Sequence, residues 1–321
     1  MRLGVLSNLA AGGGGQRAER IKEFLRDHPD VPHIQPDGPG GIGEALHHLA
    51  ERGVDVLAVS GGDGTLQRTL TELLANGQIF PELPLVAPLR AGRTNMSALD
   101  IGSDRSPARA LEKLRQSTRD NSIRAQVVKR SVLRVSLGDD LGPQYGMFCG
   151  FGTIHRAIEL THRVFPYGRS QGVFGSGVMT GLLLLRHALG KRDGVLDPDR
   201  VEIALDGTRV AASRFHVVMA TTLDRLFLKI RPFWGRERAP IRFTALEPEG
   251  RNPWKNVIKV LRGLEPVDER GAVEAGYTSH NVHTTELTLD CGLTIDGELF
   301  EPRPGRTVTL SADDRLRFVQ T

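Results

Sequence analysis

The chain has 321 residues, a net charge of +4 at neutral pH and a pI near 9.3, and 39% of its residues are hydrophobic. This length indicates two domains with a substantial core, and the mild positive charge is compatible with an anionic substrate or surface. Two cysteines and a longest apolar stretch of only 172–185 argue against a disulfide-rich secreted protein and against a membrane-spanning helix. The chain opens on a strand rather than a signal peptide, so we expect a cytoplasmic protein with reduced thiols.

The first 120 residues alternate between strand-like and helix-like patterns. Strands are predicted at 3–7, 31–35, 54–60 and 83–87, and helices at 16–26, 42–52, 66–75 and 107–116. This alternation predicts a Rossmann-like α/β domain, in which helices cover a parallel sheet. Ligands bind at the carboxyl ends of the strands in such sheets, so the glycine turns after the first and third strands should lie at one edge.

After about residue 120 strand-like runs follow one another. They occur at 123–128, 131–137 and 145–150, and they resume from 201 to 319 after helical patterns at 153–163 and 175–189. Consecutive strands predict a mainly antiparallel β-sandwich. We therefore predict an α/β domain over 1–125, a β-rich domain over 126–321 and a ligand cleft between them. The last strands could pack back on the first domain.

The turn Gly61-Gly62-Asp63-Gly64-Thr65 joins an apolar strand to an amphipathic helix. Glycines let backbone N–H groups approach a ligand, and a helix N-terminus adds about half a positive charge, so the turn suits phosphate. Asp63 fits this interpretation if Mg²⁺ lies between its carboxylate and the phosphates of a nucleoside triphosphate. The alternative is an ordinary strand–helix turn in which Asp63 caps a helix.

A second polar turn, Gly92-Arg93-Thr94-Asn95, follows the strand at 83–87. Asn95 could donate to a base, a sugar or a phosphate, and Arg93 could pair with a phosphate. Alternatively, Thr94 or Asn95 simply starts a short helix.

A late carboxylate pair follows the strand-like run at 293–295. On a continuous strand Thr294, Asp296 and Glu298 would share one face, and a carboxylate there could accept a proton from a hydroxyl substrate. Asp-Gly is also a common hairpin signal, so a plain turn is the alternative. We interpret Asp206-Gly207 as such a hairpin.

Basic and aromatic residues interleave between 225 and 262, from Arg225 and Phe227 to Trp254, Lys255 and Arg262. This composition, with the apolar helix at 175–189, suits an anionic membrane surface. A solvated face with aromatics packed inward is the alternative. No nucleic-acid-binding motif accompanies the region, so we predict no nucleic-acid partner.

Together these motifs resemble the diacylglycerol kinase catalytic family, which includes bacterial lipid kinases and sphingosine and ceramide kinases, and whose glycine-aspartate turn is shared with NAD kinase. The resemblance extends over nearly the whole chain. Asn8 before Gly12 looks like the family's opening nucleotide loop, and Gly150-Phe151-Gly152 resembles its glycine-phenylalanine-glycine stretch.

The resemblance implies an ATP- and Mg²⁺-dependent kinase acting on diacylglycerol or a similar lipid alcohol, peripheral to the inner face of the membrane. It implies catalytic roles for Asp296 and Glu298, either of which could be the base, and Mg²⁺ held by Asp63 through water. The implied ATP-binding residues are Asn8, Gly12, Gly61, Gly62, Asp63, Gly64, Thr65, Gln67, Gly92, Arg93, Thr94 and Asn95.

The chain departs from the family at several positions. Leu9 replaces a proline, Gln67 an asparagine and Arg93 a threonine, and Arg90 and Ala91 are additional residues. The shared glycine-aspartate turn keeps an NAD kinase open as an alternative, and these departures keep open a catalytically silent nucleotide- or lipid-binding regulator. The sequence identifies neither the lipid nor the oligomeric state, so a homodimer also stays open.

Overall fold

The computed structural model describes all residues except 10–14, 76, 139–141, 165–196, 249–252 and 269. The described chain forms two compact units. Unit 1 holds residues 1–131 and 315–321, and unit 2 holds the described residues between 132 and 314. The predicted apolar helix at 175–189 and the predicted loop residue Gly12 lie outside the described residues.

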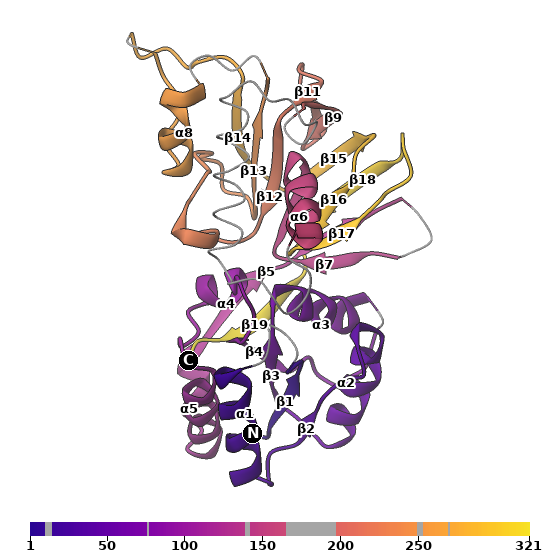
Figure 1. Ribbon diagram of the computed structural model, residues 1–321, viewed down its shortest axis with the longest axis vertical. Helices are drawn as coiled ribbons and strands as arrows, with labels where there is room; N and C mark the ends of the chain where they lie inside the picture. The colour runs from indigo at the N-terminus through magenta and orange to yellow at the C-terminus, as the bar shows by residue number, and fades with distance from the viewer. Residues whose placement is uncertain (10–14, 76, 139–141, 165–196, 249–252, 269) are drawn as a thin grey trace. The chain divides into compact units, whose positions relative to one another are not determined.

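Unit 1 is built on a six-stranded sheet in the order β2-β1-β3-β4-β19-β5 (Figure 1). Its strands are β1 (Leu3–Ser7), β2 (His33–Ile34), β3 (Val56–Gly61), β4 (Leu85–Arg90), β5 (Val127–Ser131) and β19 (Arg315–Val319). The first four are parallel, and β19 runs parallel to β4 and antiparallel to β5. The buried apolar runs of β1 and β3 explain why these strands could be predicted.

Helices cover both faces of this sheet (Figure 1). They are α1 (Gln16–Asp27), α2 (Ile42–Glu51), α3 (Asp63–Ala75), α4 (Met96–Ile101) and α5 (Pro107–Arg119), with short 3₁₀ turns η2 (Pro39–Gly41) and η3 (Ser122–Gln126). Alternate strand residues, such as Val5, Val56 and Ala87, share a core with Phe24 of α1 and Leu111 of α5. The period of two that places them on one face is the ordinary strand period.

Unit 2 contains two antiparallel sheets. One has the order β10-β9-β15-β18-β6-β7 with β11 added on β9, and the other has the order β14-β13-β12-β8-β16-β17. The first sheet holds β6 (Leu133–Ser136), β7 (Gln144–Gly146), β9 (Asp199–Leu205), β10 (Thr208–Arg209), β11 (Arg214–Phe215), β15 (Thr284–Leu289) and β18 (Thr307–Ser311). The second holds β8 (Phe148–Gly152), β12 (Val217–Thr221), β13 (Ile241–Leu246), β14 (Tyr277–Val282), β16 (Leu293–Ile295) and β17 (Glu298–Phe300).

One core joins the two sheets of unit 2. Val135 and Leu310 from the first sheet pack in the same buried cluster as Phe151 and Phe243 from the second. Helix α6 (Thr153–Val164) follows β8, and α8 (Pro253–Leu261) follows β13. The predicted fold class, an α/β unit followed by an antiparallel sandwich, is therefore confirmed.

Local predictions failed where the signal was short. The predicted strand at 123–128 begins instead as η3, because Asn121 takes a left-handed conformation and the Asp120 carboxylate accepts the Ser122 amide. The predictions also omitted α8, β14 and β17, whereas α4 begins directly after Asn95, as the short-helix alternative for the second polar turn predicted. No helix within the described ranges is long and apolar enough to cross a membrane.

Candidate functional site

The turns after β3 and β4 in unit 1 approach each other at backbone distance. We call the two turns, Gly61–Thr65 and Gly92–Asn95, the glycine clasp. A Cβ added to Gly92 would lie 2.3 Å from the Gly62 Cα, and one added to Gly61 would lie 2.5 Å from the Thr65 side chain. A side chain at 92 would therefore force the two turns apart, and one at 61 would disrupt the first turn itself.

Gly62 differs from the other two glycines. A Cβ at this position would make only an ordinary contact, 3.7 Å from the Gly92 Cα, and the backbone is not in the left-handed region. Neither packing nor backbone conformation within the described chain requires glycine here. A ligand that approaches the Gly62 backbone closely would give a reason for it.

Asp63 holds the two turns of the clasp together. Its Oδ2 accepts the Met96 amide at 3.1 Å and its Oδ1 accepts the Ser97 amide at 3.0 Å. Burial raises the pKa of the Asp63 carboxyl above its usual value, although the hydrogen bonds from Ser97 and Met96 act in the opposite direction. Asp63 therefore does cap a helix, as the alternative interpretation predicted. The helix it caps is α4, which begins thirty-three residues later in the chain.

The described residues do not form a complete magnesium site around Asp63. Both carboxylate oxygens already accept backbone N–H groups, and the cavity beside the carboxylate holds only about 10 Å³. Within the described part of the chain, no group of three or more His, Cys, Asp or Glu side chains could hold a metal ion. The carboxylate set does not fit a protein-held Mg²⁺.

Asn95 closes the second turn of the clasp. Its Oδ1 accepts the Gly92 amide at 2.7 Å and its Nδ2 donates to the Gly92 carbonyl at 2.8 Å, while its backbone is left-handed with φ 52°. The Asn95 side chain is therefore occupied by the turn itself. Arg93 is half-buried and Thr94 is exposed, so these two side chains are available to a ligand.

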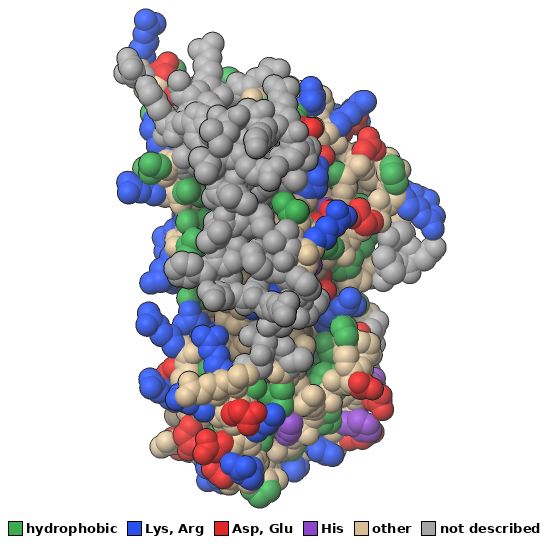
Figure 2. Space-filling view, in the orientation of Figure 1, with side chains coloured by type: hydrophobic (Ala, Val, Ile, Leu, Met, Phe, Trp, Pro, Cys, Tyr) green, Lys and Arg blue, Asp and Glu red, His purple; other side chains and the backbone are tan. Residues whose placement is uncertain are grey.

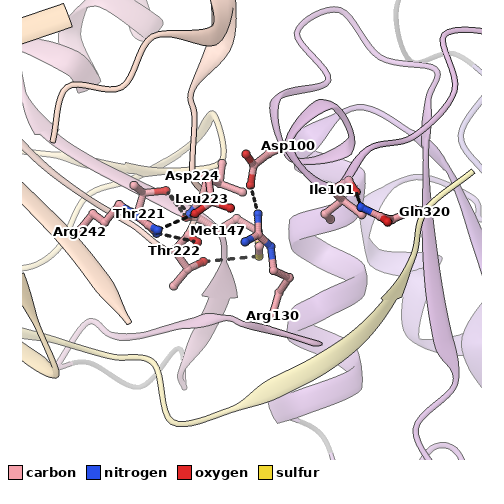
Figure 3. A network of polar contacts seen from close by, with 10 residues as sticks. All are labelled: Asp100, Ile101, Arg130, Met147, Thr221, Thr222, Leu223, Asp224, Arg242 and Gln320. Carbon is pink, nitrogen blue, oxygen red and sulfur yellow. Dashed lines mark hydrogen bonds and ion pairs between the residues drawn. The ribbon is translucent and has the colours of Figure 1, made fainter. Parts of the chain in front are cut away.

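The other end of α4 is tied to the edge of the sheet (Figure 3). The buried Asp100 carboxylate pairs with Arg130 of β5, and Gln320 donates to the Ile101 carbonyl at 2.9 Å. Helix α4 has only six residues, too few to be stable alone. The surrounding side chains fix it, and the fixed helix in turn presents its first turn to Asp63.

The end of β1 lies beside the clasp. The backbone N–H of Asn8 donates to the Ser60 carbonyl at 2.7 Å, and the side-chain Nδ2 of Asn8 donates to the Thr65 hydroxyl at 3.3 Å. The predicted residues Asn8 and Thr65 are therefore brought together. Gln67 is fully buried, and its Nε2 donates to Thr71 on the same helix, so it does not present its amide at the surface of the clasp.

Sequence reasoning missed three arginines beside the clasp, Arg17, Arg90 and Arg105, which we call the arginine cluster. Arg17 in the first turn of α1 donates to the Gly92 carbonyl at 3.5 Å. Burial lowers the pKa of Arg90, and the positive charges of Arg105 and Arg17 lower it further. Among the described residues no carboxylate forms an ion pair with any of the three guanidinium groups. The signal that could have found them was the additional residue Arg90 at the end of β4.

The clasp and the arginine cluster together fit a polyphosphate. The α3 N-terminus and the open backbone at Gly62 favour an anion, and three guanidinium groups lie close by, although the charge of Asp104 offsets part of the repulsion at Arg90. The residues present therefore fit the triphosphate of ATP through their cationic and backbone donors.

In unit 2 the late carboxylate pair lies on a hairpin. Asp296 has φ 49° and Gly297 φ 94°, and β16 pairs with β17 so that Ile295 lies opposite Glu298. The expectation that Thr294, Asp296 and Glu298 share one strand face is wrong, because a two-residue turn with two positive φ angles reverses the chain. Asp206-Gly207 forms the same kind of hairpin, as predicted.

Asp296 is buried, and backbone donors hold its carboxylate. Oδ2 accepts the Met147 amide and Oδ1 the Phe148 amide, both at 2.9 Å. A Cβ at Gly146 would lie 2.7 Å from Oδ2, so glycine there lets β7 pass close to the carboxylate. Glu298 is half-buried, and within the described residues no hydrogen bond or ion pair engages its carboxylate.

Met147 connects this carboxylate to the end of β12 (Figure 3). Its carbonyl accepts the Thr221 hydroxyl at 2.7 Å and the Thr222 amide at 3.0 Å. Arg242 donates to Asp224 at 2.5 Å and to the Thr222 carbonyl at 3.4 Å. Asp296 therefore belongs to a rigid framework within unit 2.

The basic and aromatic region does not form one continuous surface. Arg242 is in an ion pair with Asp224, and Phe233 and Trp234 are half-buried. The side chains of Trp254 and Lys255 lie outside what the structure describes. Part of the region, around η4 (Phe227–Lys229) and the end of α8, remains exposed and basic.

Comparisons with known proteins agree with the motifs. Residues 2–127 match the diacylglycerol kinase catalytic domain. Over 100% of this chain, a candidate diacylglycerol kinase from Bacillus anthracis str. Sterne is 15% identical with a TM-score of 0.68, and a diacylglycerol kinase from the same strain is 16% identical with a TM-score of 0.63. In both cases 97% of the other chain is covered.

A third solved structure is an NAD kinase from Archaeoglobus fulgidus in complex with ATP. It is 13% identical with a TM-score of 0.50, and 100% of this chain and 94% of the other are covered. At these identities the structural likenesses establish the shared fold alone. No curated protein matches the chain.

Proposed function

Since residues 2–127 belong to the diacylglycerol kinase catalytic family, as the sequence motifs predicted, we propose that this chain is an ATP-dependent kinase that phosphorylates a hydroxyl of a lipid alcohol. Diacylglycerol or a similar glycerolipid is the proposed acceptor. Family membership supports a phosphotransferase. The observation that carries the proposal further is the glycine clasp beside the arginine cluster, a site for a polyphosphate.

Each part of unit 1 has a stated task in this proposal. Bound ATP supplies the γ-phosphoryl group for transfer. The Gly62 backbone and the α3 N-terminus bind phosphate oxygens, and the arginine cluster neutralises their charge. Asp63 acts as a positioning residue, because it fixes the distance between the two turns of the clasp. Mg²⁺ would arrive with the phosphates of ATP, and we assign no step of the reaction to it.

Unit 2 supplies the carboxylates of the proposed acceptor site. Asp296 or Glu298 accepts the proton of the acceptor hydroxyl as the phosphoryl group is transferred. Asp296 is pre-oriented by two backbone amides, whereas no hydrogen bond within the described residues engages the Glu298 carboxylate. The proposal keeps both residues, and their variants separate them below.

The decisive experiment is phosphate transfer from labelled ATP, with Mg²⁺, to a panel of lipid alcohols in mixed micelles, with NAD in a parallel reaction. Label on a lipid supports the proposal and identifies the acceptor class. Label on NAD instead would replace it with the NAD kinase alternative. ATP binding without transfer would assign the chain to the regulator class.

Gly62→Ala tests the proposed phosphate site directly. Because a Cβ at 62 has room in the protein, this variant should keep its unfolding temperature. The added methyl group occupies the space in which phosphate would approach, so ATP binding and transfer should both fall. ATP binding that survives the substitution would refute the assignment of the clasp as a phosphate site.

A further inference from the structure

Unit 2 exposes large apolar side chains around one groove, away from the carboxylate framework of Asp296. The exposed fractions are 65% for Leu228, 57% for Ile258, 53% for Leu264 and 39% for Leu261. The groove has a volume of about 450 Å³ and is lined by Lys229, Ile230, Arg231, Ile258, Leu261 and Arg262. We call these eight residues the η4–α8 surface.

The charge on this surface has one sign. The segments 225–236 and 253–264 contain no acidic residue. Lys229, Arg231 and Arg262 are exposed, and within the described chain none of them forms an ion pair. Arg242, by contrast, is paired with Asp224 and does not contribute. Three available cations that surround aliphatic side chains match a partner with anionic groups above an apolar layer.

The backbone of the surface takes a rare conformation at Leu228, the most exposed of its apolar side chains. Leu228 and Lys229 have φ angles of 55° and 61°, a left-handed conformation that bulky residues rarely adopt. Such strain persists only where the surrounding structure over-determines it, and it concentrates at functional sites.

The two segments of the surface are also locked together. The Arg231 amide donates to the Leu261 carbonyl at 3.0 Å. Gly263 has φ 71°, and a Cβ there would lie 2.5 Å from the Arg231 carbonyl oxygen. The η4 segment therefore packs directly on the end of α8, and the surface is built into the fold.

We propose that the η4–α8 surface docks on a membrane that contains anionic phospholipids. The three cations bind lipid phosphates, and the apolar side chains enter the boundary between headgroups and acyl chains. Figure 2 shows hydrophobic and basic side chains beside one another along the edge of unit 2 on which α8 lies in Figure 1. The proposal does not depend on the proposed reaction, because docking requires neither ATP nor transfer.

The test is co-sedimentation, without ATP, with vesicles of phosphatidylcholine alone or mixed with phosphatidylglycerol. The native chain should sediment with the mixed vesicles, less so at high salt, and little with phosphatidylcholine alone. Ile258→Ser should weaken binding about tenfold. Lys229→Gln and Arg231→Gln each remove one positive charge, and each should weaken vesicle binding roughly fivefold.

Two control variants keep the result specific. Leu83→Ser removes an exposed apolar side chain, 38% exposed, from unit 1. Arg209→Gln removes an exposed charge from β10. Both should bind the vesicles as the native chain does. Equal losses in the controls and in the surface variants would overturn the proposal.

Leu228→Gly separates docking from folding. Glycine relieves the left-handed strain, so the unfolding temperature should stay or rise, while vesicle binding falls about tenfold. A fall in the unfolding temperature with unchanged binding would overturn the proposal and make Leu228 a structural residue. Sedimentation velocity tests the alternative that a second copy of the chain covers this surface. If the native chain is a dimer that Ile258→Ser makes monomeric, and it does not bind vesicles, the surface is an interface between copies and membrane docking is refuted.

Discussion

Arg17 and Arg20 lie almost one turn apart on α1 and differ in their neighbours. Both are exposed, but Arg17 reaches the Gly92 carbonyl and lies near Arg90, whereas no such contact is made by Arg20 among the described residues. If the arginine cluster binds phosphate, Arg17→Gln should raise the KM for ATP about tenfold and change kcat little, since it removes a charge-assisted hydrogen bond. Initial rates against ATP concentration measure this, and Arg20→Gln should leave both constants unchanged. An equal effect of the two substitutions would argue for general electrostatics.

The two carboxylates of the late hairpin should respond differently to neutralisation. In the native chain both oxygens of Asp296 accept hydrogen bonds from backbone N–H groups. Asp296→Asn replaces one oxygen by an NH₂ group, which cannot accept such a bond, so the variant should lose about 1–3 kcal/mol of stability. Glu298→Gln should leave the unfolding temperature unchanged. The variant that removes the base should lose roughly 10²–10⁴ in kcat. Thermal unfolding of both variants shows which carboxylate stabilises the fold, and single-turnover transfer shows which one acts as the base. Wild-type transfer rates in both variants would show that neither carboxylate is the base.

At the scale of elements, Glu237 ties the segment after η4 to β14. Its carboxylate accepts the Asn281 amide at 2.9 Å and pairs with His280 at 2.7 Å. Burial alone would raise the pKa of Glu237, but these hydrogen bonds lower it to about 2. A depressed carboxyl pKa contributes stability above its usual value of 4.5, and this contribution is lost as the pH falls toward 2.

Glu237→Gln should therefore lower the unfolding temperature at pH 7 and have progressively less effect as the pH is lowered from 5 to 3. Both partners are about half exposed, so solvent screening limits the loss to less than about 1 kcal/mol. Calorimetry at several pH values measures the difference between the two proteins. A difference that grows on acidification would show that the sign is wrong.

Helix α4 depends on tertiary contacts at both ends, and the Asp100–Arg130 pair is the buried one. Asp100 has no exposed side-chain surface, so Asp100→Asn removes the charge of a buried ion-pair partner of Arg130 and should cost about 3–5 kcal/mol. The exposed pair Arg119–Asp30, 3.2 Å apart, is the control, and Asp30→Asn should cost less than about 1 kcal/mol. Denaturant unfolding measures both. Similar costs would mean that solvent reaches Asp100.

The same elements explain what the sequence could and could not predict. Strands β1 and β3 were predictable because both are continuous apolar runs buried on both faces. Helix α4 was predicted only as the alternative interpretation of the turn at 92–95, because the carboxylate that accepts its first amides, Asp63, comes from a distant turn. The arginine cluster escaped prediction for the same reason, since its members come from α1, from β4 and from the segment before α5. At Asp296 the local hairpin signal was the better guide than strand alternation.

On the scale of the whole molecule, the last strand of the chain completes unit 1. β19 lies between β4 and β5 in the sheet, and Figure 1 marks both chain ends in this unit. Phe318 and Val319 of β19 are fully buried, and the Gln320 side chain reaches α4. Residues 1–131 without β19 would leave β5 without a partner strand and turn β4 into an open edge. The order of strands in the sheet therefore requires β19 for unit 1 to close.

This order predicts that residues 1–131 alone will not fold cooperatively, whereas a short added hairpin will restore folding. Ser131 and Arg315 are paired residues at the adjoining ends of antiparallel β5 and β19, so an Asn-Gly turn can join residue 131 directly to residues 315–321. Thermal circular dichroism should show a cooperative transition for the joined chain and none for 1–131. Phe318→Glu in the joined chain should abolish the transition, because it buries a charge in the core. A cooperative, native-like transition in 1–131 alone would show that the sheet closes without its C-terminal strand.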